Sequence, residues 1–147
     1  MQLPINDRLA VFSDILSFLE CVASRKYVAI DFYDGSIMYD FANGKTTICD
    51  IDLFHKQPCV NDMGRMWGSS RFQSPEEYQL GADIDEITNV YTLGATAFAL
   101  FGEYNRTREK WQLSDKLFEI ATRAVSDDRT KRQQSIRQFT AEWEAAQ

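Results

Sequence analysis

The spacing of apolar side chains predicts four helices. The first follows Asn6 or Asp7, either of which is a suitable N-cap, and ends near Ser24. Its apolar stripe is formed by Leu9, Phe12, Ile15, Leu16, Leu19 and Val22. The segment 84–101 is apolar on almost every side, with Gly and Ala where backbones can approach closely, which predicts a buried central helix. Ser114 and Ser135 are the expected caps of two further helices.

Between the first and the central helix, the pattern predicts a small β unit and a long loop. Residues 27–32 form a short apolar strand, and residues 36–41 and 45–53 form a hairpin through Asn43-Gly44. Residues 57–73 are rich in turn formers and predict a long ordered loop. Ser74-Pro75-Glu76-Glu77 has the form of a helix start, so we expect a further, short helix to follow it. The expected fold is mainly α with a small β-hairpin.

Composition narrows the class of protein. The 147 residues make one ordinary domain, 1–147, and the net charge of −6 argues against binding nucleic acid. The sequence lacks any stretch of eighteen apolar residues and any secretory leader, so we expect no membrane span and a cytoplasmic protein. Three cysteines without CxxC spacing fit reduced thiols, and the single His55 excludes sites that need two histidines.

Acidic residues stand at the ends of the predicted strands. Asp31 follows the first strand, and Asp50 and Asp52 alternate near the end of the hairpin. If these strands pair, the three carboxylates converge at one mouth, where they could bind Mg²⁺ together with substrate phosphates. A further carboxylate could take a proton from an attacking hydroxyl. The alternative is that these residues only cap turns, because Asp is a favoured turn residue.

The order of the motifs along the chain favours a functional role of these acidic residues over turn capping. They follow one another as Asp31, Ser36, Asp50-Ile51-Asp52, Ser74-Pro75-Glu76, Asn89-Val90-Tyr91-Thr92-Leu93-Gly94, and Asp128 with Arg132. This order resembles the C-terminal lobe of the protein-kinase-like superfamily, as in bacterial serine/threonine-kinase-like or aminoglycoside-phosphotransferase-like proteins, and it covers nearly the whole chain. The fold class that it implies is the mainly α C-lobe of an α+β kinase-like fold.

The resemblance assigns roles to the acidic residues. Asp31 would orient the acceptor hydroxyl or accept its proton, and Asp50 would hold the Mg²⁺ that bridges the ATP phosphates. Asp52 could add a second metal contact. Ser36 stands where the family has a metal-binding Asn, so it is the expected second metal and cofactor ligand. The stretch 67–72 could be the acceptor-docking part of an activation segment, with a structural loop anchor as the alternative.

Three further residues have structural roles by the same resemblance. Glu76 and Arg132 match a buried ion pair that ties the activation segment to the helices. Asn89 replaces an Asp of the central helix that steadies the catalytic loop. Ala29 and Ile30 stand where the family has His followed by Arg or Gly. These departures favour weakened catalysis or a pseudokinase.

The sequence also lacks a Gly-rich phosphate loop and a strand Lys, so we expect the N-lobe to be absent. The family transfers the ATP γ-phosphoryl group to a protein Ser/Thr or a small-molecule hydroxyl, with ATP and Mg²⁺ as cofactors. This chain alone would then be weak or inactive. The alternative is a non-catalytic binding module, which pairs with itself or with a separate N-lobe chain through the face that an N-lobe would cover.

Overall fold

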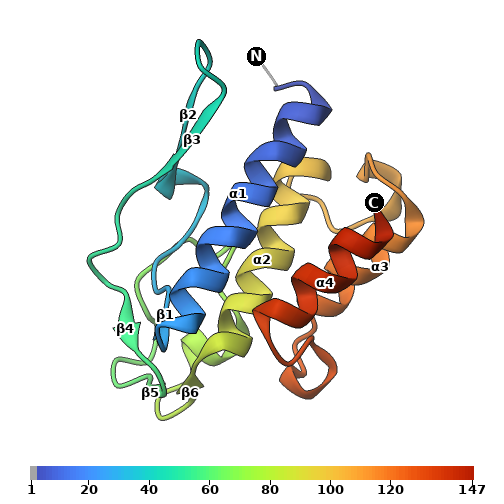
Figure 1. Cartoon of the computed structure of the whole chain (residues 1–147). Coiled ribbons are helices and arrows are strands. Elements are labelled where there is room, and N and C mark those ends of the chain that lie inside the picture. Colours follow the sequence, from blue (N-terminus) through green and yellow to red (C-terminus); the bar gives the residue numbers. More distant parts are fainter. Residues whose placement is uncertain (1–2) are drawn as a thin grey trace.

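A computed structural model describes residues 3–147 (Figure 1). The helices are α1 (Ile5–Ser24), α2 (Glu86–Phe101), α3 (Asp115–Ala124) and α4 (Ile136–Ala146). The strands are β1 (Tyr27–Val28), β2 (Ile37–Asp40), β3 (Lys45–Ile48), β4 (His55–Lys56), β5 (Cys59–Val60) and β6 (Asp83–Ile84). Short 3-10 turns cover Asp34–Ser36, Pro75–Tyr78, Arg108–Lys110 and Arg129–Lys131. The strands pair two by two, all antiparallel, as β1 with β4, β2 with β3, and β5 with β6.

Helices α1 and α2 form the centre of the molecule. Figure 1 shows the strands on one side of them and α3 and α4 on the other. The core between the helices is aromatic, with Phe12, Phe101, Trp111 and Trp143 at most 5% exposed. The ring centroids of Phe12 and Trp143 lie 4.7 Å apart, and those of Phe12 and Phe101 lie 5.8 Å apart. Burial of these large rings supplies much of the hydrophobic stabilisation.

Helix α2 is the buried central helix that the apolar pattern predicted. Asp85 caps its start, where its side chain accepts a hydrogen bond from the Ile87 N–H at 2.9 Å. Gly94 lets α3 approach closely, because a Cβ at this position would lie 2.7 Å from the Cβ of Ala124 and 2.9 Å from the carbonyl oxygen of Ala121. The loop 29–36 and the segment around Glu76 both make contacts with α2 near its start.

Several predicted boundaries were wrong. Helix α1 begins at Ile5 with Pro4 as the N-cap, rather than after Asn6 or Asp7, because the Arg8 N–H already bonds to the Pro4 carbonyl at 3.0 Å. The strand expected over 27–32 is only two residues long. The hairpin is confirmed, but its second strand ends at Ile48 instead of residue 53. The loop 57–73 contains the short strand β5, which pairs with β6.

Candidate functional site

The loop that carries Asp31 is attached to the central helix by one side chain. The Asn89 carboxamide oxygen accepts a hydrogen bond from the Ala29 N–H, and its NH₂ group donates to the Ala29 carbonyl, both at 2.7 Å. Both residues are buried. The two bonds satisfy both backbone polar groups of Ala29, which therefore has no need of a sheet partner. This explains why the predicted strand ends at Val28.

Asp31 and Asp50 lie close to each other. Burial, and then the negative charge of Asp50, raise the pKa of Asp31. Both residues have left-handed backbones, with φ of 59° at Asp31 and 56° at Asp50. This conformation is uncommon for residues other than glycine and occurs preferentially at functional sites. The pair is therefore the centre of the candidate site.

The contacts that bring the two carboxylates together differ from the expected strand pairing. The sequence prediction required the strand before Asp31 to pair with the hairpin, but β1 pairs with β4 instead. The link is made by Ser36, which is fully buried and whose carbonyl accepts a hydrogen bond from the Cys49 N–H at 2.9 Å. Because Cys49 precedes Asp50, this bond extends the hairpin and places Asp50 beside the loop of Asp31.

Ser36 and Asp52 are the two other predicted metal ligands. The Ser36 hydroxyl donates to the Asp31 carbonyl at 3.5 Å, and Asp52 is exposed and is not among the charges that shift the pKa of Asp31. Across residues 3–147, no three His, Cys, Asp or Glu side chains gather as an all-protein metal site would require. Two neighbouring carboxylates still suit Mg²⁺, which takes one or two carboxylates with substrate phosphates. A metal role for Ser36 and Asp52 stays a prediction.

Glu76 and Arg132 form a buried ion pair. The Arg132 guanidinium donates to both carboxylate oxygens of Glu76, at 2.7 and 3.0 Å, and Arg129 and Thr88 add contacts at 3.5 and 3.1 Å. Burial is the largest single influence and raises the pKa of Glu76, but the hydrogen bonds to its carboxylate and the charges of Arg132 and Arg129 together outweigh burial, so the pKa is lowered. The pair joins the end of the long loop to the start of α2 and to the segment before α4.

Two buried amide side chains order the long loop, and sequence reasoning missed both. The Asn61 NH₂ group donates to the Gly64 and Glu76 carbonyls, and its oxygen accepts from the Met63 and Gly64 N–H groups. The Gln73 NH₂ group donates to the Met66 carbonyl at 2.8 Å. An amide can bind backbone donors and acceptors at once, so it replaces a sheet partner. The only sequence signal for this role is an Asn or Gln within a turn-rich stretch, and the sequence does not show which of these amides is buried.

Tyr104, after α2, reaches the loop of Asp31, which sequence reasoning also missed. Its hydroxyl donates to the Asp34 carboxylate, which raises the pKa of Tyr104 together with burial. The Arg71 guanidinium carbon lies 4.8 Å from the centroid of the Tyr104 ring, and the ring of Phe72 meets it edge-on at 6.4 Å. Tyr104 therefore connects the long loop, the loop of Asp31 and the end of α2.

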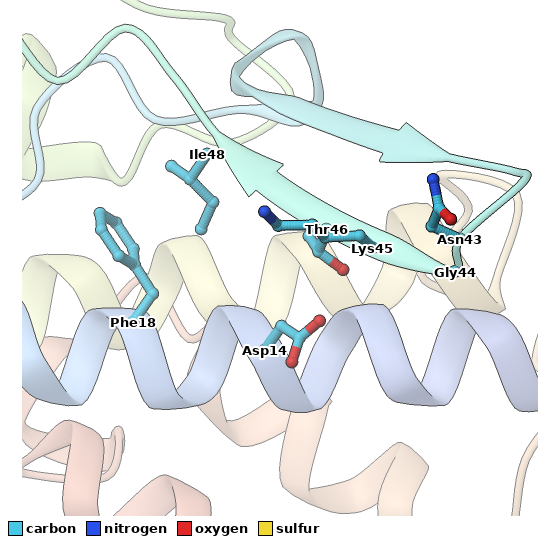
Figure 2. A pocket seen from close by; sticks show the side chains of 7 residues that line it. All are labelled: Asp14, Phe18, Asn43, Gly44, Lys45, Thr46 and Ile48. Carbon is cyan, nitrogen blue, oxygen red and sulfur yellow. The ribbon is translucent and has the colours of Figure 1, made fainter.

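Two surface features lie near the hairpin. A hollow of about 690 Å³ opens between α1 and β3, and Figure 2 shows the side chains that line it. None of them belongs to the acidic pair: they are Asp14, Phe18, Asn43, Gly44, Lys45, Thr46 and Ile48. Four large apolar side chains of the hairpin and of the segment that follows it are also exposed, namely Met38, Phe41, Ile51 and Leu53.

Comparisons with known proteins identify the fold. No model of a known protein family matches the sequence. No curated protein matches it either. Among solved structures, the chain is similar to the kinase PK-1 of Cydia pomonella granulovirus, with 14% sequence identity and a TM-score of 0.75 over 96% of this chain. The protein therefore has a protein-kinase-like α+β fold. It spans 59% of the length of that kinase chain.

Within residues 3–147, no helix combines the length and the apolar character needed to cross a bilayer.

Proposed function

We propose that this chain is the C-terminal lobe of a kinase-like protein that transfers the γ-phosphoryl group of ATP to a hydroxyl, on a protein Ser/Thr or on a small molecule. The proposal rests on one observation: Asp31 and Asp50 lie together on two left-handed backbone positions, and the loop of Asp31 is bound to the buried helix α2. The similarity to a viral kinase supports the fold in which such a pair would act.

Each carboxylate would have a distinct task. Asp31 is partly buried and its pKa is raised, which suits a group that orients a hydroxyl and accepts its proton. Asp50 is exposed and would hold Mg²⁺ against the phosphates of ATP. The metal would neutralise the charge that develops on the phosphates. We expect weak turnover from this chain alone, because phosphoryl transfer depends on groups that clamp ATP from several sides.

Calorimetric titration with ATP and Mg²⁺ tests this proposal. We expect the chain to bind ATP only when Mg²⁺ is present, and Asp50→Ala to lose this binding. Asp62→Ala is the matched control, since Asp62 is an exposed acid of the long loop without a hydrogen-bond partner in the described structure. Loss of binding in both variants would indicate an unspecific charge effect. No binding by the unmodified chain would contradict independent nucleotide binding.

A second candidate function is a non-catalytic, pseudokinase-like binding module. The exposed side chains of Met38, Phe41, Ile51 and Leu53, on the hairpin and the segment that follows it, favour it, because large exposed apolar side chains mark interaction surfaces. This surface would take a second copy of the chain or an N-lobe on another chain. Sedimentation equilibrium tests the first partner: a dimer that dissociates in the double variant Met38→Ser and Phe41→Ser would support self-association. A monomer at every concentration would contradict it.

A further inference from the structure

The hollow between α1 and β3 takes no part in the proposed phosphoryl transfer. Its volume is about 690 Å³, and both α1 and β3 line it (Figure 2). Asp14 and Phe18 of α1 point toward the hairpin. Thr46 and Ile48 of β3 lie two positions apart and therefore on the same side of the strand. This side is half-buried and faces α1, because Ile48 packs against the core between the helices.

The outer edge of β3 has free backbone groups. In an antiparallel pair, every second residue exchanges hydrogen bonds with its partner, and the residues between them point their N–H and C=O groups away from the pair. The Cys49 N–H bonds to the Ser36 carbonyl at 2.9 Å, which fixes where this alternation begins. Along the register of β2 and β3, the outward-pointing residues of β3 are then Thr46 and Ile48. Within residues 3–147 their backbones form no backbone hydrogen bond outside the hairpin, so this edge can accept a further strand.

The side chain of Thr46 also lacks a partner. Its hydroxyl oxygen is buried and forms no hydrogen bond with any residue of the described chain. A buried polar group without a partner is destabilising, and a hydroxyl can both donate and accept. An occupant of the hollow that carries its own donors and acceptors would relieve this cost. The unpaired groups of β3 therefore favour a polypeptide backbone over an apolar ligand.

The two sides of the hollow have similar spacing. Asp14 and Phe18 are one turn apart on α1, which corresponds to about 6 Å along a helix. Residues two positions apart in a strand are separated by about 6.7 Å. Figure 2 shows Phe18 opposite Ile48 and Asp14 opposite Thr46. A strand added to β3 would present every second side chain to the side of α1, so two of these side chains can meet Phe18 and Asp14.

The α1 side of the hollow is apolar at Phe18 and acidic at Asp14. Phe18 is half-buried, whereas Asp14 is exposed and forms no ion pair within residues 3–147. The net charge of the chain, −6, further favours a basic partner. The hollow thus suits an apolar side chain beside Phe18 and a basic side chain beside Asp14.

We propose that an extended segment of a partner protein adds as an antiparallel strand to the outer edge of β3 and places two side chains in the hollow. The first is apolar and lies at Phe18, and the second, two positions later, is basic and lies at Asp14. This order follows from the direction of β3, which runs from the level of Asp14 to that of Phe18, so an antiparallel segment meets Phe18 first. The binding requires neither ATP nor Mg²⁺.

A second copy of this chain does not fit the pattern. Its β3 would present Thr46 and Ile48 to the hollow, and neither of these is basic. The basic residue of β3 is Lys45, which occupies the alternate position and therefore leaves the strand on the other side. The occupant is accordingly a segment of a different protein.

Nuclear magnetic resonance on the whole isotope-labelled chain, without nucleotide, tests strand addition. The probe is the acetylated and amidated peptide Thr-Thr-Leu-Thr-Arg-Thr-Thr. We expect the backbone N–H signals of Thr46 and Ile48 to shift, and these N–H groups to exchange more slowly with water because each gains a hydrogen bond.

Two methylated peptides distinguish strand addition from other binding. In the added strand, the N–H groups of the Leu and the Arg point toward β3, and the N–H group of the Thr between them points away. A methyl group on the Leu nitrogen should therefore weaken binding about tenfold, since it removes a hydrogen bond to β3. A methyl group on the nitrogen of the central Thr should leave the pairing with β3 intact.

Matched variants test the basic residue. Asp14→Asn should weaken binding of the peptide about two- to fivefold, as the loss of an exposed ion pair does. Glu119→Gln is the control, because it removes the same charge from an exposed position of α3. Figure 1 shows α3 on the other side of α1 and α2 from the hairpin. Glu119→Gln should bind the peptide as the unmodified chain does.

Any of four results would overturn the proposal. The first is that the Thr46 and Ile48 signals do not shift at any peptide concentration. The second is equal binding of the two methylated peptides, which would exclude strand addition. The third is equal weakening in Asp14→Asn and Glu119→Gln, which would exclude a basic residue at Asp14. The fourth is that the same signals shift with protein concentration in the absence of peptide, which would assign the edge to a second copy.

Discussion

Replacing Glu77 by Gln should make the stability of the protein less dependent on pH. Glu77 is only 5% exposed, and one of its carboxylate oxygens accepts hydrogen bonds from the Ser74 N–H at 2.7 Å and the Ser74 hydroxyl at 2.9 Å. Burial raises the pKa of Glu77 from 4.5 to about 7, although the bonds from Ser74 oppose this, and the charge of Glu76 adds to the rise.

The size of the effect follows from that pKa. Each pKa unit corresponds to about 1.4 kcal/mol, so the rise from 4.5 to about 7 makes ionisation of Glu77 cost the folded state about 3 kcal/mol. Because the folded pKa is above the unfolded one, the stabilisation is fully present below pH 4.5 and is lost as the pH rises through about 7. A Gln at this position can accept the same two bonds and does not ionise.

Urea unfolding followed by tryptophan fluorescence measures this difference. At about pH 5 the two proteins should have similar free energies of unfolding, and at about pH 8 Glu77→Gln should be more stable by about 2 to 3 kcal/mol. Glu109→Gln is the control, since Glu109 is exposed and should leave the pH dependence unchanged. If the difference between Glu77→Gln and the unmodified protein were the same at both pH values, the reasoning about this buried carboxyl would be refuted.

Three further substitutions should lower the free energy of unfolding, which the same urea titration measures. Asn89→Ala leaves the buried N–H and carbonyl of Ala29 without partners, so we expect a loss of about 3 kcal/mol. Gly94→Ala gains about 1 kcal/mol of helix propensity, but its Cβ forces α2 and α3 apart. We therefore expect a net loss of about 1 to 2 kcal/mol. An increase in stability would contradict the close approach of the two helices. Arg132→Met leaves Glu76 buried without its main partner, so we expect a loss of about 3 to 5 kcal/mol, and an unchanged protein would show that Arg129 suffices.

Those parts of the fold that depend on residues close together in the sequence were predicted correctly. The Ser114 and Ser135 hydroxyls cap α3 and α4 as expected, because a cap and its partner are only three residues apart. Gly44 takes the left-handed conformation, with φ of 62°, that the hairpin turn requires. The amphipathic stripe of α1 is buried, although the helix starts earlier than predicted.

The candidate site depends on contacts between distant residues, and these were predicted less well. The side chain of Asn89 reaches Ala29 across 60 residues of sequence, and Tyr104 reaches Asp34 across 70. A local pattern of hydrophobic and polar positions carries no information about such pairs. The resemblance to kinase-like proteins singled out Asp31 and Asp50 by their order, and their role stays a prediction. The sequence contained no signal that Tyr104 would meet Asp34 and Arg71.

The chemistry of the Asn89 side chain affects how the loop of Asp31 responds to acid. A carboxylate at this position could accept the Ala29 N–H but would repel the carbonyl, and it would gain a proton at low pH. The carboxamide of Asn89 donates and accepts at the same time and has no proton to gain or lose in this range. The attachment of this loop to α2 is thus insensitive to acidity, so protonation of the Asp31 carboxyl, whose pKa burial raises, leaves its backbone support unchanged.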